Sequence, residues 1–139
     1  MDVKKLLFGG IAGGIAHFFL GWLIYGILLA DFMAKHPGLL PNPMKVEPDF
    51  LYLIIGNLAF GFLQAYIYIK GNVNTMVNGI VTGGILGALM AVGFDSVNYA
   101  TSSTLSKTAM AADVVAATVL TAIVGAIIAI AMNLGKKTA

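Results

Sequence analysis

Residues 6–30 read LLFGGIAGGIAHFFLGWLIYGILLA and include no aspartate, glutamate, lysine or arginine. A helix of roughly 20 apolar residues is enough to cross about 30 Å of hydrocarbon. The run is too long for the apolar part of a signal peptide, and no A-x-A-like cleavage site follows it. We therefore expect a retained membrane-spanning helix, and its glycines and its histidine need an explanation.

Three further runs have spanning length, within residues 50–69, 76–98 and 109–134. Unpaired backbone polar groups cannot face lipid, so each run is predicted to be a helix. The composition agrees, because 59% of the residues are hydrophobic and only 10% are charged, which is outside the range of soluble domains. We predict an all-α protein, an integral membrane four-helix bundle that forms a single domain over residues 1–139 and contacts the lipid bilayer.

Four spans place both termini on the same side of the membrane, and the basic residues indicate which side. All eight are lysines. One side would hold Lys4, Lys5, Lys70, Lys136 and Lys137, and the other would hold Lys35, Lys45 and Lys107. Basic residues favour the cytoplasmic side, so we predict cytoplasmic termini in a bacterial inner membrane. The absence of arginine, which supplies bidentate phosphate contacts, argues against a nucleic-acid partner.

The longest connection, residues 31–49, contains all the prolines of the chain, Pro37, Pro41, Pro43 and Pro48. Proline lacks a backbone donor and clashes within a helix, so this segment is not expected to be a regular helix. Two interpretations stay open for it. It is either an ordered cap over the outer helix ends or a docking surface for another protein.

Small residues recur at every fourth position in three of the predicted helices, which places them on one helix face. These rows include Gly9, Gly13 and Gly21 in the first helix, Gly79, Gly83 and Gly87 in the third, and Gly125 in the fourth. In a bilayer, helices associate through the close approach that such small residues allow. We expect the first and third helices to cross closely, or one of them to form a homo-oligomer contact.

His17 lies near the middle of the first span, on its glycine face, where ionisable residues are rare and often functional. It defines a candidate intramembrane polar site with Asn57 and Gln64. Three roles are open: a neutral histidine hydrogen-bonded across the helix contact, a proton relay or solute-binding group, and an axial ligand to haem or chlorophyll. For the last role, Gly13 would leave room for the macrocycle one turn away, whereas His36 is out of register to serve as a second ligand.

A second candidate site, on the outer face, contains Asp95, Asn98 and Asp113. Held together, these groups could bind a cation or carry a proton. Alternatively, the aspartates anchor helix ends in the headgroup layer, with Asp113 helping to cap the fourth helix. Most of the tyrosines resemble interfacial or packing aromatics, and only Trp22 and Tyr25 lie deep enough to line a cavity.

No catalytic signature is present. The chain lacks H-E-x-x-H, G-x-S-x-G and phosphate-loop motifs, and it has no cysteine. Its two histidines are too far apart in sequence to suggest a metal site. We expect a protein that is not an enzyme, with no catalytic residues, no metal and no cofactor unless His17 holds a haem or chlorophyll.

Two short elements resemble small four-helix bacterial membrane families that are described only as domains of unknown function. LGWLIYG (residues 20–26) and FDSVNYAT (residues 94–101) carry the resemblance. The matching positions are Gly21, Trp22 and Tyr25, then Asp95 and Asn98, and later Asp113. This chain lacks the tryptophans that those families have in the last connection and at the start of the fourth helix, and its first outer loop is rich in proline. The resemblance implies four helices and assigns no activity.

Three functions follow from these observations. The first is a multi-pass membrane protein that acts by helix packing, as a homo-oligomer or as an accessory or structural subunit of a larger membrane complex. The alternative is a small transporter or channel, with His17 and Asp95 or Asp113 available for proton coupling. The third is a pigment- or haem-binding membrane subunit.

Overall fold

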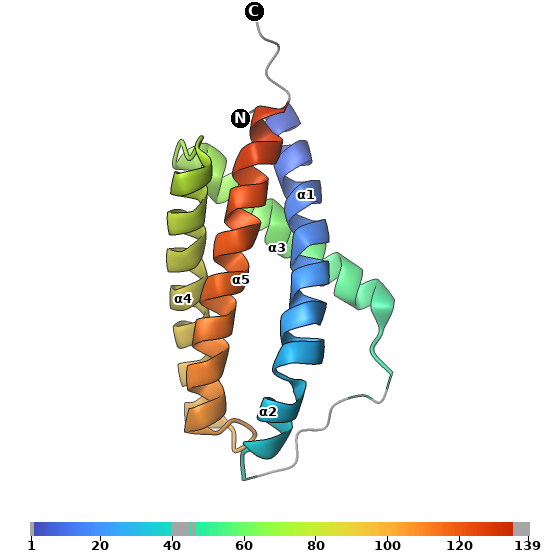
Figure 1. The fold of residues 1–139 in the computed structure, drawn as a ribbon, viewed down its shortest axis with the longest axis vertical. Helices are drawn as coiled ribbons and strands as arrows, with labels where there is room; N and C mark the ends of the chain where they lie inside the picture. The colour runs from blue at the N-terminus through green and yellow to red at the C-terminus, as the bar shows by residue number, and fades with distance from the viewer. Residues whose placement is uncertain (1, 40–44, 46, 135–139) are drawn as a thin grey trace, which may run out of the picture.

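The computed structural model describes residues 2–39, 45 and 47–134, and within them the named elements are all helices (Figure 1). Four of the helical rods are long and apolar enough to span a membrane. The elements are α1 Val3–Gly21, η1 Trp22–Leu28, α2 Ala30–Lys35, α3 Phe50–Lys70, α4 Met76–Thr101 and α5 Lys107–Asn133. The predicted all-α, four-span fold is confirmed, and the protein is a small integral multi-pass membrane protein in contact with lipid.

Each spanning helix begins at a side chain that accepts a hydrogen bond from a backbone N–H of the first turn. The four capping residues are Asp2, Asp49, Thr75 and Ser106. Such caps satisfy donors that have no partner within the helix. Because Ser106 caps α5, that helix starts at Lys107 rather than at residue 109, and the interpretation of Asp113 as a capping residue is wrong.

Helical structure continues beyond the end of the first predicted span, although the apolar span itself is Val3–Leu28. The chain passes through η1, a π-helix, and after Leu29 it forms α2, which ends at Lys35 before the first proline. The start of the predicted irregular segment 31–49 is therefore helical. Beyond it, Ser106 Oγ donates a hydrogen bond of 2.7 Å to the carbonyl oxygen of His36, which attaches this end to the α4–α5 connection. Pro41 and Pro43 lie outside the described residues, so both interpretations of the whole segment stay predictions.

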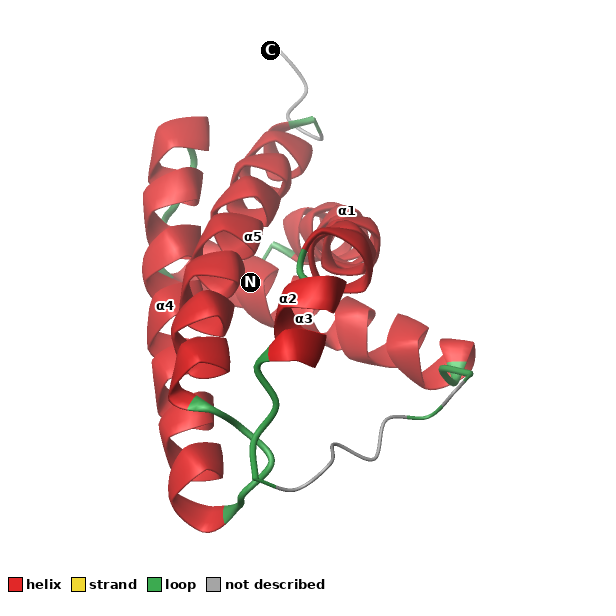
Figure 2. Ribbon diagram, turned by 60° about the horizontal axis from the view of Figure 1, so that its bottom comes forward, coloured by secondary structure: helices red, strands yellow, loops and turns green. Residues whose placement is uncertain are grey.

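The spans form two sequential pairs. α1 packs against α3, α4 packs against α5, and α5 also packs against α1. Figure 1 shows α3 crossing obliquely behind the other helices, with its first residues far from α4 and its last residues close to it. Figure 2 shows α4 and α5 side by side, with α1 next to them. The predicted close crossing of the first and third spans, α1 and α4, is wrong. The glycines of α1 contact α3 and α5, and those of α4 contact α5.

The glycines of α1 divide between two partners. A Cβ added to Gly9 or Gly13 would lie 2.8 or 2.7 Å from side-chain carbons of Met132 or Ile128 in α5. On the α3 side, Gly61 allows backbone-to-backbone contact, since an added Cβ there would lie 2.5 Å from the carbonyl oxygen of Gly10. Close approach of this kind is what small residues supply in membrane helix pairs.

The α4–α5 contact also depends on glycine. An added Cβ at Gly79 would lie 2.5 Å from Gly125 O, and one at Gly87 would lie 2.6 Å from Ala117 O. Gly83 faces the backbone of α5 at Thr121 in the same way. Gly21 differs from the other predicted packing glycines, because an added Cβ would meet nothing within 4 Å. It faces a pocket instead of a helix.

Candidate functional site

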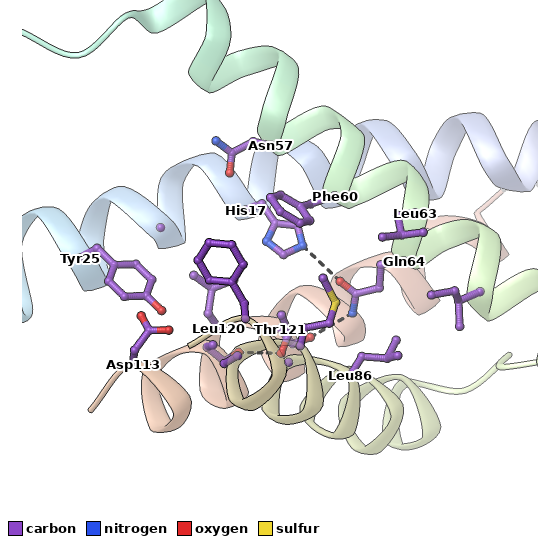
Figure 3. A pocket seen from close by; sticks show the side chains of 17 residues that line it. His17, Tyr25, Asn57, Phe60, Leu63, Gln64, Leu86, Asp113, Leu120 and Thr121 are labelled. Carbon is purple, nitrogen blue, oxygen red and sulfur yellow. Dashed lines mark hydrogen bonds between the residues drawn. The ribbon is translucent and has the colours of Figure 1, made fainter. Parts of the chain in front are cut away.

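A pocket of about 500 Å³ lies between the two helix pairs and is partly open. Figure 3 looks into it between α3 and α4, with α1 and α5 behind. Its walls are mostly apolar and include Phe60, Leu86, Met90 and Leu120. The first residues of α3 lie far from α4 and its last residues lie close to it (Figure 1), and side chains of both helices line the pocket. A mainly apolar cavity with a few placed polar groups is typical of small-molecule sites.

At its inner end the pocket contains a hydrogen-bonded network centred on Gln64. His17 Nε2 lies 3.2 Å from Gln64 Oε1, and the Gln64 amide donates to the Tyr68 hydroxyl (3.0 Å) and to the Thr121 carbonyl oxygen (3.1 Å). Since both amide hydrogens are used, Oε1 must accept, and His17 must donate from Nε2. In the neutral tautomer Nδ1 is then an acceptor, and it faces the pocket in Figure 3.

The network continues through Tyr68 to α4. The Tyr68 hydroxyl donates to the carbonyl oxygen of Gly79, and its side chain is 0% exposed. One glutamine thereby connects α1, α3, α4 and α5. Tyr68 was expected to be an interfacial or packing aromatic and not part of a polar site, so its role in this network was missed. The four-residue spacing of Gln64 and Tyr68, which puts them on one helix face, was the available signal.

At the other end of the pocket lies Asp113, whose partner is a second carboxylate from the neighbouring helix. Asp95 in α4 is only 5% exposed and interacts with Asp113 in α5. Its Oδ2 atom is buried and has no hydrogen-bonding partner among the described residues. The Tyr25 hydroxyl points toward the Asp113 carboxylate (Figure 3). Asp113 lines the pocket and Asp95 does not.

The π-helix η1 brings Tyr25 to this position. The Leu29 N–H donates to Ile24 O at 2.8 Å, a bond across five residues instead of four. Such π-segments are rare, and they occur often at functional sites. Trp22, which was expected to be deep enough to line a cavity, is instead 62% exposed toward lipid.

Other predicted site residues lie apart from these clusters. Asn57 lines the pocket, but its amide donates to Leu53 O in its own helix at 2.7 Å rather than to His17. Asn98 accepts from Ser102 Oγ at 2.7 Å and does not join the carboxylates. The space that a macrocycle would need beside Gly13 is filled by Ile128 and Gly61.

No protein-family model matches the chain, and no curated protein or solved structure gives a significant match. The resemblance of the LGWLIYG and FDSVNYAT elements to four-helix families therefore stays a prediction. In the structure, these elements place Gly21 and Tyr25 at the pocket and Asp95 beside Asp113. The function is accordingly argued from the pocket.

Proposed function

We propose that the protein is a small membrane transporter that takes its substrate from the bilayer into the pocket between its two helix pairs. The observation that supports this proposal is that one cavity contains two pairs of polar side chains. His17 and Gln64 lie at one end, and Asp113 and Tyr25 lie at the other. The sequence suggested these groups as two separate sites. Apolar walls with polar groups at two places suit an amphiphilic small molecule.

The packing hypothesis has less support than it had from the sequence. It rested on glycine faces that could attract a partner chain, and in the structure most of those glycines contact other helices of the same chain. The pigment hypothesis loses the space expected beside Gly13. We propose binding and movement rather than catalysis, because the sequence has no catalytic motif.

Filling the pocket tests this function. We expect Gly21→Leu to weaken binding of a neutral apolar probe, N-phenyl-1-naphthylamine, by about tenfold or more, a loss of about 1.4 kcal/mol. The new side chain has free space at its Cβ and extends into the cavity, so the helices need not move. The measurement is saturable binding of the probe to the purified protein in detergent, by equilibrium dialysis against protein-free micelles.

The matched control is Gly93→Leu in α4. A Cβ at Gly93 also meets nothing within 4 Å, and Gly93 does not line the pocket. This variant should bind the probe as the parent protein does. Equal binding by the parent and by Gly21→Leu would show that the pocket is not a binding site.

We further propose that the termini are cytoplasmic and that the membrane is a bacterial inner membrane. The lysine distribution supports this orientation, and α2 with the α4–α5 connection lies at the end of the bundle opposite the start of α1 and the end of α5 (Figure 1). The polar outer end of the pocket, with Asp113, would then lie in the outer leaflet.

Single-cysteine labelling of the cysteine-free chain tests the orientation. In intact cells, we expect Leu39→Cys to react with a membrane-impermeant maleimide, because Leu39 is 92% exposed near the outer helix ends. Val3→Cys, at the start of α1, should react only after the cells are permeabilised. The reverse pattern would invert the proposed topology.

A further inference from the structure

We propose that the pocket selects lipophilic cations, molecules with an apolar body and an ammonium-type positive charge that rests against the Asp113–Asp95 pair. This inference rests on the proposed function and names its substrate class. It depends on how the charges of the described residues are placed, and the following observations support it.

The carboxylate pair needs a positive partner. Asp95 Oδ2 is buried without a hydrogen-bonding partner among the described residues, and the charged group that acts on Asp95 is a second carboxylate, Asp113. Buried charges are otherwise paired or neutralised, because leaving one alone in a low-dielectric region is costly. A cation bound beside Asp113 would supply the positive charge that the described residues around the pair do not.

The geometry of the pocket fits a cation attached to an apolar body. Asp113 and the Tyr25 hydroxyl face the cavity at one end, while Phe60 and Leu86 form walls further along it (Figure 3). Aromatic faces such as that of Phe60 also attract positive charge. The titratable groups that face the Asp113–Asp95 pair or share its pocket are Tyr25 from η1 and His17 from α1; α3 contributes the neutral Gln64 and Asn57.

The side of entry follows from the fold. The pocket opens between α3 and α4, which are not packed along it, so a molecule dissolved in the lipid reaches the site without crossing the aqueous face. Two sources supply this chemistry, the ammonium headgroup of a lipid and a free amphiphilic amine. Both place the positive charge near the interface and the apolar part deeper in the membrane.

Two probes of the same shape and opposite charge test the selection, tetraphenylphosphonium and tetraphenylborate. Binding to the purified full-length protein in detergent is measured for each probe, with Gly21→Leu as the baseline for uptake by the micelle. We expect the cation to bind about tenfold more tightly than the anion, since one close charge pair changes affinity by at least that factor. Asp113→Asn should remove the preference, whereas Asp31→Asn, an exposed aspartate in α2, should keep it.

The outcomes separate the two proposals. If Gly21→Leu abolishes the binding of both probes but the parent protein binds them equally, or prefers the anion, cation selection is wrong and the pocket remains a binding site. If Gly21→Leu changes nothing, both proposals fail. If Asp113→Asn does not fold, the affinities of the parent protein for tetraphenylphosphonium and tetraphenylborate still show whether the pocket selects cations.

A competition arm identifies the source of the cation. Displacement of tetraphenylphosphonium by phosphatidylethanolamine, and not by phosphatidylglycerol, supports the proposal with a lipid headgroup as the ligand. Displacement by a long-chain amine alone supports it with a free amphiphile as the ligand. If phosphatidylglycerol displaces tetraphenylphosphonium as well as phosphatidylethanolamine does, the proposed selection of cations is contradicted.

Discussion

Replacement of Gly61 by alanine is expected to separate α1 from α3. The three atoms nearest to an added Cβ are all backbone atoms, belonging to Gly10, Gly13 and Gly14. Backbone cannot move aside as a flexible side chain can, so the two helices must part along their contact. Overpacking of this kind costs about 1–3 kcal/mol and occasionally more, and we expect Gly61→Ala at the upper end of that range. The measurement is unfolding in detergent, followed by circular dichroism.

Gly56→Ala provides the comparison on the same helix. It makes the same chemical change in α3, at a position where an added Cβ meets nothing within 4 Å. Helix propensity favours alanine over glycine in both variants, so any difference between them measures the helix contact. Equal stability of the two variants would mean that α1 and α3 do not approach as closely as the structure shows.

Gln64→Met is expected to give the second large effect. Methionine keeps the length of the side chain but leaves His17 Nε2 and the Thr121 carbonyl oxygen without their partner. Each unsatisfied buried group costs about 1–3 kcal/mol, although hydrogen bonds between membrane helices average only about 0.6 kcal/mol. Because one side chain serves three partners, we expect a loss of about 2 kcal/mol in the free energy of unfolding.

Asn57→Leu is the matched control, another amide removed from a pocket-lining position of α3. Its only recorded bond within the described part of the chain goes to Leu53 O in its own helix, so its loss should leave stability nearly unchanged. A double-mutant cycle between Gln64→Met and His17→Leu then isolates the coupling of the two side chains. Coupling near zero would contradict the hydrogen bond between them.

The spans were predictable from the sequence because hydrocarbon thickness fixes their length and lipid forbids unpaired backbone groups. The pairing of the spans was not predictable. The glycine rows of α1 and α4 indicate that each helix has a face that can pack closely against another helix. They do not indicate which helix that partner is. Gly61, the closest contact of α3 with α1, stands alone without a four-residue glycine row.

The site was partly predictable. His17 and Gln64 were suggested as partners because polar groups in an apolar span require each other, and the structure places them 3.2 Å apart. That their cavity also reaches Asp113 depends on the oblique course of α3, which no local pattern encodes. Tyr68 was expected to be an interfacial or packing aromatic; it is fully buried, and its hydroxyl also donates to the carbonyl oxygen of Gly79, which its position in the sequence did not indicate.

The π-helix at Trp22–Leu28 has a consequence in evolutionary terms. Where a hydrogen bond spans five residues instead of four, its ring encloses one residue more than in an α-helix, as a one-residue insertion into an α-helix would produce. Related sequences that lack the insertion would keep the register of His17 but rotate everything after it by about 100°, the angle of one residue in an α-helix. In such relatives, the residue facing Asp113 would be a neighbour of the position that Tyr25 holds here.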